Sequence, residues 1–293
     1  MKKRKGIKLN TAVLVLIFLA GLSLMLYPSF SEQWNARHHG QVIDGYKEQV
    51  QIMDSDRYGE VWGEAENFNR KLLERSNRFV LPKELSEEYA RCLDIYDNGV
   101  MAYLEIPSIN CTLAVYHGTD ESILQTNVGH IEWSSLPVGG ESTHCVLSGH
   151  RGLPSAELLT NIDHLEIGDV FYIHVLDEKL TYVVDDITVI EPTDMECLRI
   201  YEGKDYVTLL TCTPYGINSH RLLVRGERVI TDNAVETGVV NVINEIAEVD
   251  KALVVTVSTV ILALVACAAM LVPGVLRKKN LAGNRVKNDE ETN

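Results

Sequence analysis

Residues 206–225 read YVTLLTCTPYGINSHRLLVR, and this stretch carries the clearest structural signal in the chain. An alternating run of β-branched and aliphatic residues ends at Cys212, and a second run, LLVR, begins after Arg221. The residues between them that favour a turn are Pro214, Gly216 and Asn218. We therefore expect two strands joined by a turn, with Cys212 and Arg221 as neighbours. A cysteine becomes a nucleophile in such surroundings, because a nearby cation favours the thiolate.

Short alternating runs of the same kind continue outward from this stretch, beginning near Asn98. They are VMAYLEI, CTLAVY, CVLSG, VFYIHVL, LTYVVDDITVI, YVTLLTC and HRLLVRGERVI, each bounded by Gly, Pro, Asn or Asp. Many short strands predict a mainly β fold, a barrel or a sandwich. The interval Ser155 to Leu165 predicts a helix within it, with Ser155 as the N-cap. Upstream, Ser31 to about Leu93 has the spacing of charged amphipathic helices.

Two long apolar blocks lie outside this region, at Thr11–Tyr27 and Ala252–Val272. Each is long enough to cross a bilayer, and basic residues precede the first and follow the second. The positive-inside rule then puts both termini in the cytoplasm and the middle of the chain outside. The first block also resembles a signal peptide, but no small-residue cleavage site follows it, so we expect an uncleaved anchor.

Charge and cysteine content narrow the class of protein further. The 293 residues carry a formal net charge of −14, which argues against nucleic-acid binding. Six cysteines occur with no CxxC pair and no spacing typical of metal ligands, so we expect neither a metal nor another cofactor. A Cys92–Cys197 disulfide is one open alternative, because an oxidising exterior permits it.

A nucleophilic cysteine usually needs a base, and two histidines are the main candidates. His150 sits in SGHRGLPS, where a strand ends among small residues and a proline. His220 is next to Arg221, but successive strand residues point to opposite faces, so only one of these two can face Cys212. The spacing alone leaves both histidines open.

Several blocks now carry a resemblance to a known family. TLLTC, followed nine residues later by Arg221 and preceded by GHRGLP, resembles the sortases of Gram-positive bacteria. AYLEIPSI, YHGT, SLPVGG, SGHRGLPSAELL and TCTPYGINSHRLLVRGER resemble the class C, pilin-polymerising sortases more specifically, over about residues 99–228. The resemblance implies a closed β-barrel of about eight strands with short helices, an N-terminal helical layer and two transmembrane helices.

The resemblance also implies a site and a reaction. It makes His150, Cys212 and Arg221 the catalytic residues, and we expect Thr211, Pro214, Tyr215 and Asn218 to contact substrate. Cys212 would cleave an LPxTG-like sorting signal between Thr and Gly, and a pilin lysine would then take the acyl group. Three alternatives stay open: a cell-wall anchoring sortase that uses a peptidoglycan amine, a cysteine protease, and a non-catalytic tethered barrel.

One part of the sequence departs from the class C pattern. These enzymes usually carry an Asp-Pro-aromatic lid before the barrel, whereas this chain has Leu81-Pro82-Lys83 there. Phe79 or Tyr89 could replace the plug, or the site could be open.

The sequence thus divides into six expected parts. They are a basic tip with an anchor (1–30), a helical segment with a possible lid (31–97), the catalytic barrel (98–232), a linker (233–251), a second membrane helix (252–276) and a cytoplasmic tail (277–293).

Overall fold

The computed structural model describes residues 9–230 and residue 260. The predicted linker, second membrane helix and tail, apart from Val260, lie outside the described residues, as does the basic tip up to residue 8. Among the described residues, 30–230 belong to one compact unit and 9–29 to another. Within the described residues, no helix has the length and apolar character needed to span a bilayer. The first predicted span, in the N-terminal part of α1, is therefore not confirmed.

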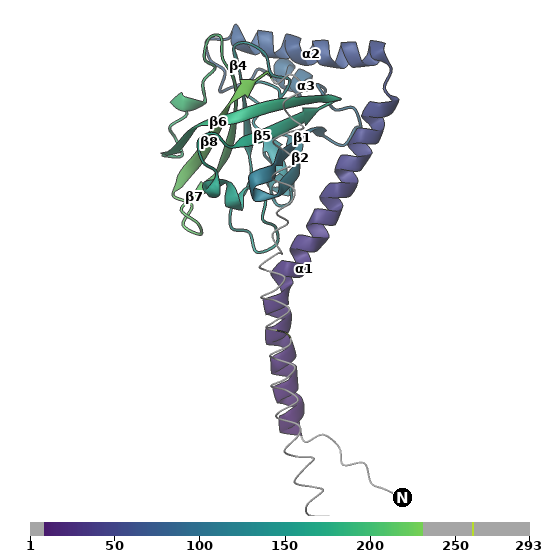
Figure 1. Ribbon diagram of the computed structural model, residues 1–293, viewed down its shortest axis with the longest axis vertical. Helices are drawn as coiled ribbons and strands as arrows, with labels where there is room; N and C mark the ends of the chain where they lie inside the picture. The colour runs from purple at the N-terminus through teal and green to yellow at the C-terminus, as the bar shows by residue number, and fades with distance from the viewer. Residues whose placement is uncertain (1–8, 231–259, 261–293) are drawn as a thin grey trace, which may run out of the picture. The chain divides into compact units, whose positions relative to one another are not determined.

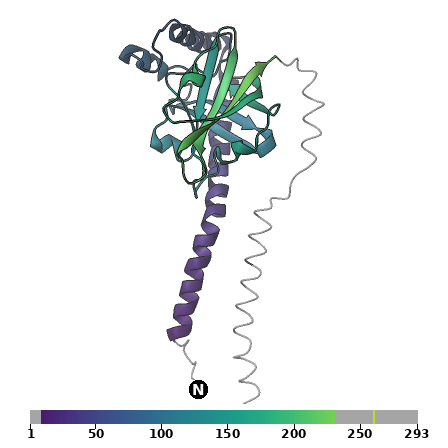
Figure 2. The same cartoon turned by 90° about the vertical axis from the view of Figure 1, so that its left-hand side faces the viewer.

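The centre of the fold is a closed barrel of eight strands (Figures 1 and 2). Around the barrel the strands run in the order β1-β2-β3-β4-β7-β8-β6-β5, and β5 pairs with β1 to close it. The strands are β1 (Val100–Ile106), β2 (Cys111–His117), β3 (Val128–His130), β4 (Thr143–Ser148), β5 (Val170–Val175), β6 (Glu178–Ile190), β7 (Asp205–Thr213) and β8 (His220–Val229). The mainly β, closed-barrel expectation is confirmed.

All seven predicted strand runs form strands, and one strand was missed. The pairs β2–β3 and β4–β7 are parallel, while the other neighbours are antiparallel. The missed strand, β3, has only three residues, too few to show an alternating pattern. Alternation along the longer strands gives the barrel a packed interior, with Leu104, Val207 and Val224 fully buried.

Helices precede and connect the strands. They are α1 (Leu9–Ile52), α2 (Ser55–Leu73), α3 (Lys83–Tyr89) and α4 (Glu121–Leu124), with 3₁₀ turns η1 (Pro107–Ile109), η2 (Thr160–His164) and η3 (Glu196–Leu198). Figure 1 shows α2 across the end of the barrel opposite the β7–β8 turn. Asp54 caps α2 by accepting a hydrogen bond from the Arg57 amide, and Phe68 and Leu72 pack into the main core. The predicted helical layer is present.

The helix predicted from Ser155 to Leu165 is wrong. The interval is a loop in which Leu153 and Ala156 form an isolated bridge, and only Thr160–His164 make a 3₁₀ turn. Leu158, Leu159 and Ile162 are all buried, so their apolar spacing reflects packing of a loop under the barrel end. Tertiary burial explains the pattern that looked helical.

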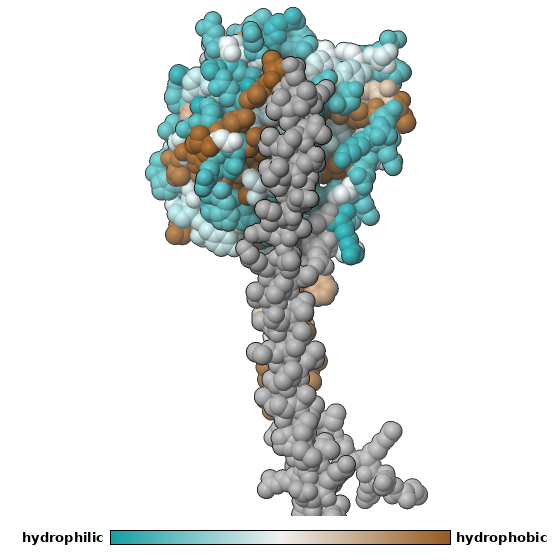
Figure 3. Space-filling view, in the orientation of Figure 1, coloured by the Kyte–Doolittle hydropathy of each residue, from teal (hydrophilic) through white to brown (hydrophobic). Residues whose placement is uncertain are grey.

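The surface of the barrel is mostly polar and carries one apolar band. Figure 3 shows that the side of the barrel facing the viewer is largely hydrophilic, with apolar residues gathered into a band. Exposed apolar side chains include Val189 on β6 and Ile217 in the β7–β8 turn.

Candidate active site

Cys212 and Arg221 are directly opposite each other on neighbouring strands. Cys212 lies near the end of β7, Arg221 lies near the start of β8, and the two pair in the antiparallel register. Opposed residues point to the same face of a sheet with Cβ atoms about 5 Å apart. Both residues are half-buried. The sequence-based expectation that they are neighbours is confirmed.

His150 reaches the same face from the neighbouring strand β4. The parallel ladder places Ser148 opposite Leu210. One residue further on, the Gly149 amide donates to the Leu210 carbonyl at 3.1 Å, and the Thr211 hydroxyl donates to the Gly149 carbonyl at 2.7 Å. Because side chains alternate, His150 follows on the face of Cys212. Cys212 and Arg221 thus lie on the adjacent strands β7 and β8, and His150 lies two residues beyond the end of β4, the neighbour of β7.

His220 takes a different position. It pairs with Thr213 and is one residue from Arg221, so its side chain leaves the opposite face of β8. Its Nε2 lies 3.1 Å from Glu191 Oε1, and its Nδ1 lies 2.8 Å from the Ser219 hydroxyl. Of the two candidate histidines, His220 is therefore directed away from the face of Cys212, whereas continuing the β4–β7 register places His150 on that face.

Three other histidines of the barrel make contacts within the fold. His144 is fully buried, and desolvation lowers its pKa to about 4. His130 is also fully buried, with its pKa lowered to about 3 by the same effect. The ring nitrogens of His117 lie 3.0 Å from the Gly99 carbonyl and 2.7 Å from the Cys92 carbonyl. These imidazoles are engaged inside the fold and do not face Cys212.

The four expected substrate contacts separate into two groups. Thr211 is buried inside the barrel, where its hydroxyl binds Gly149, so it does not share the face of Cys212. The other three, Pro214, Tyr215 and Asn218, are exposed in the β7–β8 turn beside the site. Tyr215 is 61% exposed, yet its ring lies so close to Gly152 that a Cβ there would approach it to 2.9 Å. The turn therefore contacts the loop that carries His150.

The arginine retains donors for a ligand. Arg221 Nη1 donates to the Asn218 carbonyl at 3.3 Å and to the His220 carbonyl at 3.1 Å. Within residues 9–230 these are the hydrogen bonds of its guanidinium, which leaves Nε and Nη2 for a substrate oxygen. A half-buried cation with donors of fixed direction is suited to a carbonyl or a developing oxyanion.

The face below the cysteine is first apolar and then polar. Leu210 and Leu223 are the next opposed pair on the same face, two residues from Cys212 and Arg221. Leu198 of η3 packs in the same cluster. On the next rung Thr208 is opposite Arg225.

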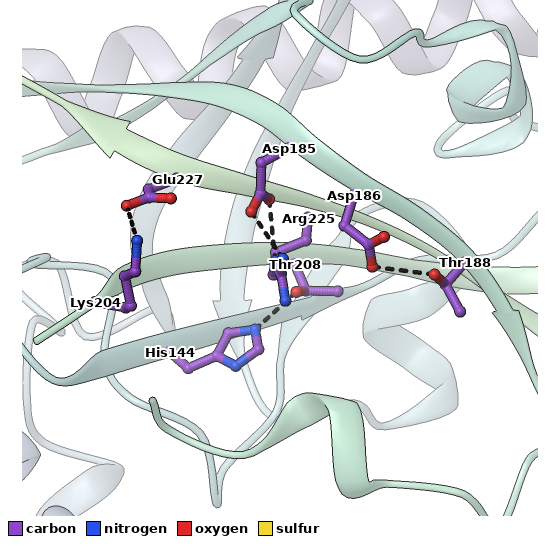
Figure 4. A network of polar contacts seen from close by, with 8 residues as sticks. All are labelled: His144, Asp185, Asp186, Thr188, Lys204, Thr208, Arg225 and Glu227. Atoms are coloured by element: carbon purple, nitrogen blue, oxygen red, sulfur yellow. Dashed lines mark hydrogen bonds and ion pairs between the residues drawn. The ribbon is translucent and has the colours of Figure 1, made fainter. Parts of the chain in front are cut away.

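Figure 4 shows the polar network at this level. Arg225 makes two hydrogen bonds to Asp185, at 3.0 and 2.7 Å. His144 Nε2 lies 2.7 Å from the Thr208 hydroxyl. His144 Nδ1 lies 2.7 Å from the Arg199 carbonyl. This network fastens the β6–β7 segment to the strand that bears Cys212.

Two charged residues at the site were not singled out from sequence. Glu121 Oε2 on α4 is 3.4 Å from His150 Nε2. Arg151, the residue after His150, has a largely buried side chain that ion-pairs with Asp163. Arg151 lies inside the GHRGLP motif, so a charged residue between a histidine and a glycine was the available signal. Nothing in the sequence around Glu121 indicates its contact.

Tyr89 is a packing residue and does not plug the site. Its hydroxyl accepts a hydrogen bond from the Gly118 amide at 2.8 Å and lies 3.1 Å from His130 Nδ1. Phe79, the other candidate plug, packs edge-on against Trp133 with ring centroids 4.9 Å apart.

The Cys92–Cys197 disulfide is not formed, because both cysteines are free: Cys92 is buried, and Cys197 packs near Leu198.

Comparison with known proteins agrees with this architecture. The sortase domain family matches residues 104–229. Sortase C1 from Streptococcus agalactiae is 45% identical, with 66% of this chain and 100% of that chain covered and a TM-score of 0.64. Streptococcus pneumoniae sortase C is 48% identical over 65% of this chain and 97% of that one, with a TM-score of 0.59.

A third solved structure is Clostridium perfringens sortase C with the C-terminal cell wall sorting motif. It is 43% identical over 65% of this chain and 99% of that chain, with a TM-score of 0.58. A search of curated proteins gave no match. The chain belongs to the class C sortases, a family of cysteine transpeptidases.

Proposed function

We propose that this transpeptidase cleaves an LPxTG-like sorting signal between Thr and Gly and joins the new carboxyl end to a pilin lysine. The observation that carries the proposal is the pairing of Cys212 with Arg221, and the β4–β7 register, which ends two residues before His150, supports His150 as the third residue. Two of the similar structures support the substrate class, since one is described with a cell wall sorting motif and another in terms of pilin substrate specificity.

In the first half of the reaction, the Cys212 thiolate attacks the threonine carbonyl carbon. The carbonyl oxygen becomes an oxyanion, which the free donors of Arg221 stabilise. Collapse of this intermediate breaks the Thr–Gly bond, and His150 gives a proton to the departing glycine amine. The products are a thioacyl enzyme and the released C-terminal peptide.

In the second half, the lysine amine of the next pilin attacks the thioacyl carbonyl. His150, now neutral, takes the proton that the amine loses, and Cys212 leaves as the thiolate. The new isopeptide bond stores the energy of the bond that was cleaved, so no external energy source is needed. Exclusion of water from the thioacyl group decides between transfer and hydrolysis.

The proposal includes attachment to the cell membrane by both apolar blocks. Basic residues before Thr11 and after Val272 support two spans with both termini cytoplasmic and the barrel outside. Labelling by a membrane-impermeant maleimide tests this in intact cells of a Cys212→Ala background. A cysteine introduced at Ser31 should react, whereas one introduced near the C-terminus should react only after lysis.

The reaction is tested with the full-length protein in detergent and an LPxTG-type peptide. Intact mass should show a thioacyl adduct on Cys212 and, after addition of a lysine-bearing pilin, a peptide-linked pilin. Cys212→Ala should form no adduct, while the matched control Cys111→Ala should behave as the wild type. Arg221→Ala should lower kcat on the order of 100- to 1,000-fold. Joining of pilins by Cys212→Ala, or full activity in His150→Ala, would contradict the proposal.

A further inference from the structure

Arg151 lies where the backbone contact between the two catalytic strands ends. The β4–β7 ladder stops at Ser148 and Leu210, followed by the hydrogen bond from Gly149. Beyond Gly149 the chain turns into the loop that leads to η2. The position of His150 relative to Cys212 therefore depends on side-chain contacts of this loop.

The Arg151 side chain makes the next link in the same register. Continuing the pairing places His150 beside Cys212 and Arg151 beside Thr213. Arg151 Nη1 donates to the Thr213 hydroxyl at 3.3 Å, and Nη2 binds Asp163 of η2. One guanidinium thus connects the residue after the histidine, the residue after the cysteine, and the far end of the loop.

Burial shows that this guanidinium is held in place. The Arg151 side chain is only 9% exposed, and within residues 9–230 its Nε is buried without a hydrogen-bond partner. A buried cation with an unsatisfied donor is costly, so it calls for a role that an apolar residue could not fill. The planar fork of arginine spans two acceptors at once, whereas lysine would reach only one of them.

Neighbouring contacts also support the loop around Arg151, although none of them reaches the residue directly after Cys212. The Gly152 amide donates to the Thr160 hydroxyl at 3.0 Å. Gly152 has φ +77°, a conformation suited to glycine, and it lies against the Tyr215 ring. These contacts fix the loop to itself and to the β7–β8 turn.

We propose that Arg151 is a positioning residue, which holds His150 at the distance from Cys212 that proton transfer requires. The proposal rests on the function proposed above, because it assigns Arg151 to the same cysteine–histidine reaction. Arg151 does not touch the reacting atoms. Through its contacts with Thr213 and Asp163, it holds the chain that follows β4 at a fixed distance from the end of β7.

The experiment uses paired substitutions in the full-length protein. Arg151→Gln and Thr213→Val remove the link from either side, while Thr213→Ser keeps the hydroxyl. Arg57→Gln, which removes an exposed ion pair on α2, is the matched arginine control. For each variant, kcat and KM are measured with the LPxTG-type peptide, together with the rate at which iodoacetamide alkylates Cys212 and the Tm.

Arg151→Gln and Thr213→Val should lower kcat on the order of 10- to 100-fold, with KM changed by less than about threefold. Thr213→Ser and Arg57→Gln should stay within about twofold of the wild type. Alkylation of Cys212 should slow in Arg151→Gln toward the rate of His150→Ala, because a displaced imidazole no longer assists thiolate formation.

A kcat within about threefold of wild type in Arg151→Gln or in Thr213→Val would overturn the proposal. So would a Thr213→Ser enzyme as slow as Thr213→Val. If Arg151→Gln fails to fold, as its Tm would show, the two Thr213 variants decide alone. If the wild type forms no adduct with the peptide, the proposed function fails, and the alkylation rates still test Arg151 separately.

Discussion

Two buried histidines should make the fold sensitive to mild acid. His144 faces the Arg199 carbonyl, which can only accept, so Nδ1 carries the proton and Nε2 accepts from the Thr208 hydroxyl. In the same way, His130 Nε2 donates to the Ser135 carbonyl, and Nδ1 accepts from Tyr89. Each imidazole is therefore neutral, and burial lowers the pKa of His144 to about 4 and that of His130 to about 3.

The sign and size of the effect follow from these pKa values. In the unfolded chain both histidines have a pKa of about 6.5, so between pH 6.5 and pH 4 the unfolded state binds more protons than the folded one. The free energy of unfolding must then fall as the pH falls through 6.5, and it continues to fall until the folded pKa is reached. At pH 5 the folded imidazoles are still neutral, so each histidine lowers the free energy of unfolding by about 2 kcal/mol relative to its value at pH 7.5. That figure is insensitive to the folded pKa, because either value lies well below pH 5.

Urea denaturation followed by tryptophan fluorescence at pH 7.5 and pH 5 measures the effect. The two histidines together should reduce the free energy of unfolding by about 4 kcal/mol in the wild type. His144→Gln keeps an amide donor and a carbonyl acceptor but cannot titrate, so its loss should be smaller by about 2 kcal/mol. Equal losses in wild type and His144→Gln would refute the reasoning. The two proteins share every other titrating group, so subtracting one loss from the other leaves only the contribution of His144.

Three further substitutions test packing and hydrogen bonding, one beside the site and two elsewhere in the fold. Gly149→Ala should lower stability by about 1–3 kcal/mol and reduce kcat, because the added Cβ would lie 2.8 Å from Leu159 Cγ beside His150; thermal melting and peptide kinetics check this. Gly63→Ala should instead raise stability by about 0.5–1 kcal/mol, since nothing lies within 4 Å of its Cβ position in α2, and a lowered Tm would contradict it. Tyr89→Phe should destabilise by about 1–3 kcal/mol, because the Gly118 amide and His130 both lose a buried partner; an unchanged urea midpoint would count against these hydrogen bonds.

The alternating runs predicted the strands well because they depend on local information. Each of the seven predicted runs has apolar residues on one face, and seven strands formed where they were expected. The same alternation, with a turn of known composition, was enough to set Cys212 opposite Arg221. An antiparallel pair joined by a short turn has a register that the sequence itself limits.

Other parts of the molecule depended on contacts between distant segments. The Ser155–Leu165 interval carries apolar residues at helical spacing, yet they are buried as a loop beneath the barrel end. The buried roles of His130 and His144 depend on the Tyr89 hydroxyl and the Arg199 carbonyl, each from a distant segment. No local pattern distinguishes such a histidine from a catalytic one, which is why spacing alone could not separate His150 from its competitors.

The choice of histidine depends on closure of the barrel. Strands β4 and β7 are parallel neighbours, and the chain between them forms β5 and β6 on the other side of the barrel. Parallel pairing needs such a long crossover, so its register is not set by a turn. Once Ser148 pairs with Leu210, the period of two places His150 beside Cys212, while His220 is directed to the other face of β8. Cys212 and Arg221 are thus paired by local sequence, whereas the third residue of the site is supplied by a long-range pairing. The Arg151–Thr213 hydrogen bond lies just beyond the end of that pairing. At this point no strand pairing between β4 and β7 holds His150 at a fixed distance from Cys212.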